Sequence, residues 1–456
     1  MSVFGTWPTA MRRIALVVSV LSAACSDQSS FSPPQLTEPS FAKAAASPTV
    51  KSASPAWAEQ GAVNLSVTIN GSGFDKSARA SWNLNGVPYA KIAVNSTSFV
   101  SSSQIVANIS IAADAEVNDY DVVVMMSGSK QGIGSDLFTV TLAQPIPLVG
   151  RAINMAGQVV GEPINSSTTA ALWDPSIGLV PLPNAYKVWG IDETGTTISG
   201  KGNDNFAAVW TSTTGPAGPW TETPLPLPPG ASVGSARSLA SDASGNALFI
   251  AGSYRTATMA TAPIVWTRTA SGWQARWYGF PPGVLSGWVQ SVNAKGQSAG
   301  MDGSGGAYAL YWDSLGTPAL LSSNNATAWS INGDGTVVVG SANGVAAMWV
   351  RTLSGGVYGP WSGDILLDTP ANSCSSPSSA AFAVNAAGTA AVGTSCNQPV
   401  AWLISGTTAT RRLLGTLGPP NSGSAFAINN LDMPNAAGGA GQSTSGFGSG
   451  VFWRSF

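Results

Sequence analysis

Histidine is absent from this chain of 456 residues, so carboxylates are the main side chains that could do chemistry. Without His, Ser-His-Asp catalysis, Cys-His catalysis and His-ligated metal sites are excluded. Three cysteines are too few for a four-cysteine metal site, and no glycine-rich phosphate loop ends in Lys-Ser or Lys-Thr. We therefore expect no metal and no cofactor.

Carboxylates could still hydrolyse glycosides, a reaction that needs two acids facing each other across the substrate. Glu162, Asp204 and Asp302 each follow the second predicted strand of a repeated unit, which would place them on loops of one face. They are candidate ligand-face residues, with ordinary solvated loop charge as the alternative. Asp192 and Asp242 occupy a repeat position where other units carry Asn, so turn closure explains them without chemistry. The sequence predicts no catalytic residue.

A repeated cassette from Leu148 onward supplies the elements that position these acids. Each unit has an alternating strand, an Asn or Asp anchor, a β-branched strand, and a third strand that ends in Trp. Gly follows the anchor by three residues in six of the seven units, which indicates a hairpin turn with φ > 0 at Gly. The anchors are Asn154, Asp192, Asp242, Asn293, Asn332, Asn385 and Asn429, and the Trp residues are Trp173, Trp210, Trp266, Trp312, Trp349, Trp402 and Trp453.

Four short antiparallel strands repeated seven times predict a seven-bladed β-propeller over residues 144–456. The seventh unit has no fourth strand of its own after Trp453. The segment 144–148 has the fourth-strand pattern, so we expect it to complete the last blade and remove two exposed sheet edges. Aromatic residues in the longer segments are expected to pack between blades, with stacking on sugars as the alternative; these are Trp220, Trp273, Trp277, Tyr278 and Trp361.

The first 25 residues have the pattern of a bacterial export signal. Arg12 and Arg13 precede an apolar run that is too short to span a bilayer, and small residues then lead to Cys25. This end resembles a lipobox, which implies lipidation of Cys25 and attachment to a membrane; plain secretion is the alternative. Residues 26–47 are rich in Ser, Pro and Ala and are predicted to be a tether.

Residues 48–143 contain short alternating strands, such as that of Val63, Leu65, Val67 and Ile69, which predict a β-sandwich. The segments SPAWAEQGAVNLSVTINGSGF, SSSQIVANI, NDYDVVV and DLFTV resemble an IPT/TIG immunoglobulin-like domain. The later repeats, most clearly RRLLGTLGPPNSGSAFAINN, resemble the HAF family of extracellular repeats, which implies secretion and repeat architecture without a defined activity. The fold class predicted for the whole chain is therefore all-β.

Charge and cysteine content agree with an exported protein. Only 9% of residues are charged, against roughly 25% in a typical soluble protein, and the net charge is -2. This gives no electrostatic footprint for nucleic acid. Cys374 and Cys396 flank the hairpin of the sixth unit and are predicted to form a disulfide; two buried thiols are the alternative.

These features favour a non-enzymatic binding, adhesion or structural module of the cell envelope, with an envelope glycan or protein as the possible partner. The alternative is a polysaccharide-active enzyme, a glycosidase or a lyase, with carboxylates carried on the propeller. A pair of facing acids in one pocket would favour the enzyme, whereas acids scattered among turns would favour the binding module.

Overall fold

The computed structural model describes residues 47–456, apart from 165–168, 232, 259, 304–307, 369–377, 418–421, 432–435, 444–445 and 454–456. For residues 436–443 and 446–448 the backbone alone is described. The described chain is all-β, as predicted, with one short 3-10 turn at Ser127–Ser129. No helix in these residues is long and apolar enough to cross a membrane.

The first part of the described chain is a sandwich of two sheets. One sheet has the order β1-β3-β7-β6, and the other β2-β9-β8-β4-β5, in which β2 and β9 are parallel. The strands are β1 (Thr49–Ser54), β2 (Trp57–Glu59), β3 (Leu65–Ser72), β4 (Arg79–Leu84), β5 (Val87–Pro88), β6 (Ile92–Ser101), β7 (Gln104–Ile111), β8 (Asn118–Met125) and β9 (Gln131–Thr141).

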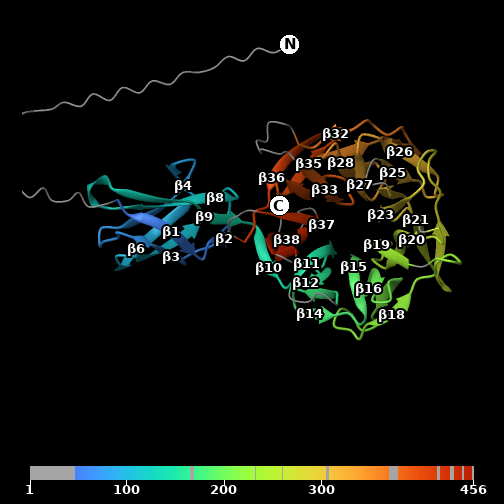
Figure 1. Cartoon of the computed structure of the whole chain (residues 1–456), viewed down its shortest axis with the longest axis horizontal. Coiled ribbons are helices and arrows are strands. Elements are labelled where there is room, and N and C mark those ends of the chain that lie inside the picture. Colours follow the sequence, from blue (N-terminus) through green and yellow to red (C-terminus); the bar gives the residue numbers. More distant parts are fainter. Residues whose placement is uncertain are drawn as a thin grey trace, which may run out of the picture. The chain divides into compact units, whose positions relative to one another are not determined.

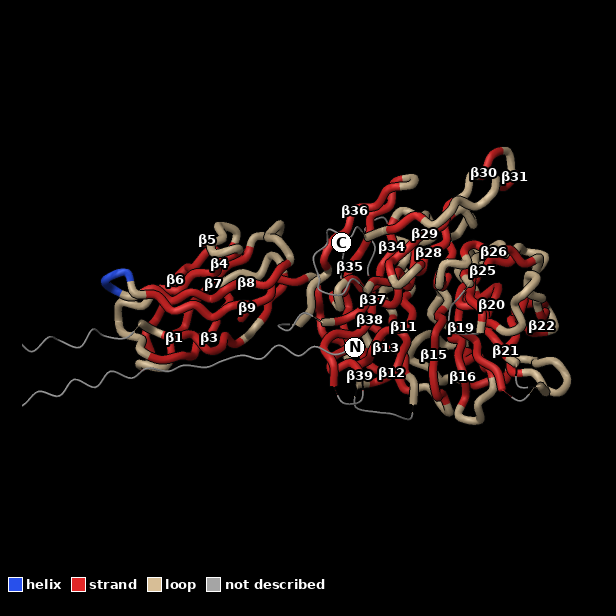
Figure 2. Tube along the Cα trace, turned by 45° about the horizontal axis from the view of Figure 1, so that its top comes forward, coloured by secondary structure: helices blue, strands red, loops and turns tan. Residues whose placement is uncertain are grey.

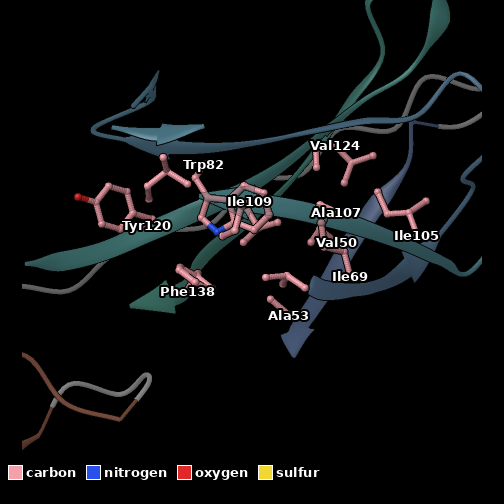
Figure 3. Packing of buried hydrophobic residues seen from close by; sticks show 14 of the residues in the cluster. Val50, Ala53, Ile69, Trp82, Ile105, Ala107, Ile109, Tyr120, Val124 and Phe138 are labelled. Carbon is pink, nitrogen blue, oxygen red and sulfur yellow. The ribbon is translucent and has the colours of Figure 1, made fainter. Parts of the chain in front are cut away.

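The sandwich core is built from apolar residues at alternating positions along the strands of both sheets (Figure 3). Trp82 of β4 meets Phe138 of β9 edge to face, with ring centroids 5.6 Å apart. The expected alternation in β3 begins two residues late, because Asn64 has a φ of +54° and interrupts the strand. Val63 consequently lies outside β3 and is 72% exposed, although the sequence pattern placed it on the strand.

The second part is a ring of seven four-stranded antiparallel sheets, which is the predicted seven-bladed propeller (Figure 1). Blade 1 comprises β11 (Leu148–Ile153), β12 (Val159–Pro163), β13 (Ala171–Asp174) and β14 (Gly178–Pro181). Blade 2 comprises β15 (Ala185–Ile191), β16 (Thr197–Gly202), β17 (Ala207–Thr211) and β18 (Thr221–Pro224). Blade 3 comprises β19 (Val233–Ser241), β20 (Ala247–Arg255), β21 (Thr261–Thr269) and β22 (Gly272–Trp277).

Blades 4 to 6 continue the ring with the same strand order. Blade 4 comprises β23 (Gly287–Val292), β24 (Ser298–Asp302), β25 (Ala309–Trp312) and β26 (Pro318–Ser322). Blade 5 comprises β27 (Ala326–Ile331), β28 (Val337–Ala342), β29 (Val345–Val350) and β32 (Ile365–Leu366). Blade 6 comprises β33 (Ser379–Val384), β34 (Ala390–Ser395), β35 (Gln398–Ser405) and β36 (Thr408–Leu413). Blade 5 also carries the small hairpin of β30 (Leu353–Ser354) and β31 (Val357–Tyr358), which projects from the ring in Figure 2.

Blade 7 joins the two ends of the propeller. It consists of β37 (Gly423–Ile428), β38 (Ala436–Ser443) and β39 (Gly446–Trp453), and its fourth strand is β10 (Ala143–Ile146), which pairs with β39. The predicted closing segment is therefore right in kind but shifted. Leu148, assigned to it from the sequence, instead begins the first strand of blade 1, and Ala143 belongs to the propeller.

The repeated Trp residues form the blade cores. Six of the seven are fully buried, and each donates its indole N–H to an oxygen in a connecting segment, as Trp210 does to the carbonyl of Pro183 at 2.7 Å. Trp173 is the exception, because it is half-buried and packs against Phe452 of blade 7.

The anchors close their turns, as the repeat pattern predicted. In Asn332, for example, the side-chain oxygen accepts the N–H groups of Thr336 and Val337, both at 2.8 Å. The Gly residue three positions after each of six anchors has a positive φ, between 66° and 86°. Several anchors also join blades: Asn154 donates to the carbonyl of Asp192, and Asn429 of blade 7 donates to the carbonyl of Asn154.

Candidate ligand-binding cavity

The first strand of every blade borders the centre of the ring (Figure 1). Each of these strands carries a β-bulge at an equivalent position. A bulge leaves one residue of its strand without a cross-strand partner and turns that side chain out of the regular alternation. In all seven blades the bulged side chain is long or aromatic, and all seven line one central cavity. These residues, called the bulge ring below, are Arg151, Trp189, Arg237, Gln290, Trp329, Phe382 and Phe426.

Neighbouring members of the bulge ring contact one another around the axis. Phe382 packs against Trp329 edge to face and against Phe426 on its other side, with ring centroids 5.4 Å and 5.3 Å apart. The Arg151 guanidinium lies over Phe426 at 4.8 Å, and that of Arg237 lies over Trp189 at 5.4 Å. The ring thus has an aromatic half, in blades 5 to 7, and a polar half.

The cavity has a volume of about 590 Å³, within the range of roughly 300–1,000 Å³ usual for small-molecule sites. It extends from the bulge ring to the turns between the first and second strands. Aromatic and arginine side chains line its wall, together with Ser238, Ser291 and Ser330, whose hydroxyl oxygens each accept a backbone N–H from the next blade. This combination of apolar surface with a few polar groups suits recognition of a small organic molecule.

The two arginines of the bulge ring differ in charge balance. Arg151 donates from Nε to the Oε2 atom of Glu162 at 2.7 Å, so its charge is neutralised within blade 1. Arg237 forms no ion pair with any described residue within 4.0 Å, and its buried Nε has no hydrogen-bond partner there. Its closest polar contact is a 3.5 Å hydrogen bond from Nη1 to Gln290. Burial lowers the pKa of the Arg237 guanidinium from its usual value.

At the turn end of the cavity, Glu193 connects three blades. One of its carboxylate oxygens accepts the N–H of Met155 in blade 1 at 2.7 Å, and the other accepts from the Asn430 amide in blade 7 at 3.4 Å. Burial raises the pKa of Glu193, and the hydrogen bonds oppose that rise only in part. Asp242, the other acid that lines the cavity, is exposed and uses Oδ1 to accept the N–H groups of Ser244 and Asn246.

Of the three acids predicted as ligand-face residues, only Asp204 lies on a loop after its second strand. Glu162 lies within β12 and Asp302 ends β24, and none of the three lines the cavity. Glu162 is the ion-pair partner of Arg151. Asp204 is exposed and closes its own turn by accepting the N–H of Phe206. Asp302 is only 2% exposed and accepts the N–H of Tyr308. Each acid therefore has a local structural role, and no group of three or more metal-ligating side chains occurs among the described residues.

Four of the five aromatic residues predicted to pack between blades are wholly or partly buried. Trp220, Trp273 and Tyr278 join or pack against blade cores, and Trp361 packs against Tyr311 at 5.2 Å. Trp277 differs, because it is 58% exposed at the end of β22. Their positions favour packing over ligand contact, and none of the five lines the cavity.

Two of the predicted covalent features fall outside the described residues. Cys396 is disulfide-bonded, whereas Cys374, its predicted partner, belongs to 369–377, and Cys25 belongs to the first 46 residues. Both the pairing of Cys374 with Cys396 and the lipidation of Cys25 stay predictions.

The sequence interpretation missed the bulge ring, although the repeat contained a signal for it. In six blades the bulged residue lies three positions before the anchor; in blade 3, Arg237 lies five positions before Asp242. An alignment of the units on their anchors would have shown large or charged side chains recurring at this position.

Comparison with known proteins gives no family for the chain, because neither a family model nor a curated protein matches it. Among solved structures, a triple arginine-to-alanine mutant of AofleA from Arthrobotrys oligospora is 16% identical, covers 67% of this chain and 91% of its own length, and has a TM-score of 0.29. A DUF4784 family protein from Bacteroides caccae is 11% identical, covers 69% and 94%, and has a TM-score of 0.22.

Proposed function

We propose that this protein is a non-enzymatic binding module of the cell envelope and that the central cavity of its propeller receives the ligand. The bulge ring is the observation that carries the proposal. Bulges of this kind recur next to functional sites because they redirect a side chain out of a regular strand. A bulge needed only for blade curvature would suit any side chain, whereas all seven positions here hold long polar or aromatic residues.

The acids that line the cavity support binding over hydrolysis. Glycoside hydrolysis needs two carboxyl groups available to the substrate on either side of the bond. Glu193 uses both oxygens to join blades, and Asp242 accepts two backbone N–H groups in its own turn. These hydrogen bonds favour a structural role for both acids.

Binding of the purified protein to an array of neutral and acidic glycans, followed by titration of each hit, tests the proposal. We expect Trp329→Ala to weaken binding by about tenfold or more, since an aromatic contact in a desolvated pocket contributes on that scale. Trp277→Ala is the matched control, because this exposed Trp lies outside the cavity. The proposal fails if no glycan binds, or if Trp277→Ala weakens binding as much as Trp329→Ala.

A search for cleavage products distinguishes the binding module from the alternative, a polysaccharide-active enzyme. Each glycan that binds is incubated with the protein, and the mixture is separated by chromatography. Intact glycan is expected; accumulation of shorter products that is abolished by Glu193→Gln or Asp242→Asn would replace the binding module with a polysaccharide-active enzyme.

Attachment to the envelope is proposed to occur through lipidated Cys25, on the strength of the small residues before it and the Ser- and Pro-rich stretch after it. Fractionation of expressing cells should find the protein with membranes and the Cys25→Ala variant in the soluble fraction. An unchanged membrane association of the variant would rule out this anchor.

A further inference from the structure

We infer that the ligand of the cavity carries a negatively charged group, a carboxylate or a phosphate, and that this group binds to the Arg237 guanidinium. The inference rests on the proposed binding function and specifies the chemical class of its ligand. It starts from the geometry of Arg237, the member of the bulge ring whose charge has no acidic partner among the described residues.

The guanidinium of Arg237 packs against two indole rings and forms no ion pair with a described residue. It lies over Trp189 at 5.4 Å and over Trp288 at 5.7 Å, contacts that involve the π-systems of the two indoles. The N–H donors of a guanidinium point outward in its plane, and because Nε is buried, the terminal Nη groups are the donors that remain for a ligand. Apart from the long hydrogen bond to Gln290, none of the described hydrogen bonds uses them.

Such an arrangement matches a planar or tetrahedral anion. A guanidinium edge can donate two parallel hydrogen bonds to a carboxylate or a phosphate, and these charge-assisted bonds are roughly twice as strong as neutral ones. Ser238, the next residue along β19, also lines the cavity; its hydroxyl oxygen accepts the N–H of Val292 at 3.2 Å, which leaves its own O–H able to donate.

Positive charge around Arg237 is reinforced by its neighbours. Lys187 and Lys201 are cross-strand partners in blade 2. The pKa of Lys201 is lowered by burial and further by the positive charges of Arg237, Lys187 and Arg255. A buried charge without a counter-ion is costly for a folded protein, and a ligand anion would remove that cost.

The aromatic half of the bulge ring would contact the uncharged part of the same ligand. Trp329, Phe382 and Phe426 form a continuous apolar surface across the cavity wall. The site therefore fits a small organic anion with a ring or an apolar body better than it fits a bare inorganic ion.

Titration calorimetry with D-glucuronate, D-glucose 6-phosphate and D-glucose separates charge from shape, because the three probes share a pyranose ring. We expect at least one of the anions to bind the wild-type protein, glucose to bind at least tenfold more weakly, and the affinity for the anion to fall as salt rises. The tighter of the two anions distinguishes a carboxylate ligand from a phosphate ligand. Failure of both anions to bind at concentrations up to about 10 mM, a range that still detects weak millimolar sites, would overturn the inference.

Substitutions assign the anion to Arg237. Arg237→Gln should weaken binding of the anion at least tenfold and Arg237→Lys by less, whereas Arg412→Gln, on exposed β36, should leave the affinity within twofold. In the absence of ligand, Arg237→Gln should melt at the wild-type temperature or higher, because it removes an unpaired, half-buried charge. A lower melting temperature together with unchanged anion affinity would make Arg237 a structural residue.

The two proposals fail in different ways. If glucose binds as tightly as the anions and Trp329→Ala weakens all three, the cavity is a binding site but its ligand is not selected by charge. If neither the probes nor any glycan of the array binds, the binding function itself is wrong.

Discussion

At the scale of single residues, Glu193 and Asp242 show that two acids lining one cavity can differ in how well water solvates them. Asp242 lies in an exposed turn, where water solvates its charge. Glu193 is half-buried between blades, and loss of solvation raises its pKa despite the hydrogen bonds from Met155 and Asn430. The charged form of Glu193 is thus a local cost to the folded state at neutral pH.

This difference predicts a pH-dependent effect of Glu193→Gln. A carboxyl group with a raised pKa in the folded protein binds its proton more tightly there than in the unfolded chain, so its contribution to stability is lost as pH rises. The variant should therefore gain stability relative to wild type as pH rises from below 4.5, the ordinary Glu value, to neutrality. Chemical denaturation at several pH values measures the difference; a constant difference across this range would show that Glu193 has an ordinary pKa.

The bulge ring is the part of the site that the interpretation of the sequence missed. Trp189 and Ile191 are two residues apart, which is the spacing of side chains on one face of a strand. The alternating pattern in the sequence therefore predicted that both lie on the same face of the first strand of blade 2. The structure has a bulge between Val188 and Gly190, so that Val188 and Ile191 pack into the core and Trp189 does not; Trp189 lines the cavity, which Ile191 also borders. A single unpaired residue reverses the alternation, and composition alone does not reveal it.

At the scale of elements, the first turn of each blade has two functions that can be separated. It reverses the chain within its own blade and, in some units, bonds to the next blade. Asn293 does both, since its oxygen accepts the N–H groups of Lys295 and Gln297 and its amide donates to the Asn332 carbonyl at 3.0 Å. Asp242, at the same repeat position, shows only bonds within its own turn.

Replacing these two anchors by Ala should separate the functions. Asn293 is 4% exposed, so Asn293→Ala leaves buried partners unsatisfied and should lower the free energy of unfolding by about 2–4 kcal/mol. Asp242→Ala removes an exposed turn contact and should cost about 1 kcal/mol or less. Denaturant unfolding of both variants provides the test, and equal losses would mean that the bond between blades contributes nothing.

The turns were also the elements best predicted from the sequence. The Asn/Asp-x-x-Gly pattern requires a side-chain acceptor at its first position and a positive φ at its last, and both requirements have a direct chemical signature. The ends of the strands were harder to predict from the sequence. Val63 has a suitable side chain for β3, but the backbone at Asn64 ends the pairing before it.

At the scale of the whole molecule, ring closure depends on a strand far from blade 7 in the sequence. Gln144 and Ile146 of β10 pair with Phe452 and Gly450 of β39, so β10 supplies the outer strand that the seventh repeat lacks. Counting complete and incomplete units was enough to predict this closure. The predicted bounds, 144–148, differ from those of β10 by one residue at the start and two at the end, because Leu148 is as apolar as the residues of β10.

Deletion of residues 143–146 should destabilise the protein far more than deletion of 26–47. The first removes the outer strand of blade 7 and exposes the backbone of β39, which would favour aggregation. We expect its melting temperature to fall by about 10 °C or more, consistent with a loss of several kcal/mol in a domain of this size. Scanning calorimetry with light scattering compares the two deletions, and equal melting temperatures would show that β10 is dispensable for closure.

The central claim is that the bulge ring surrounds a ligand site. A crystal structure of the protein with the tightest-binding glycan or sugar anion tests this most directly. We predict electron density inside the cavity, in contact with Arg237 on one side and with Trp329 or Phe382 on the other. Density confined to the outer strands or to the grooves between blades, with an empty bulge ring, would contradict the claim.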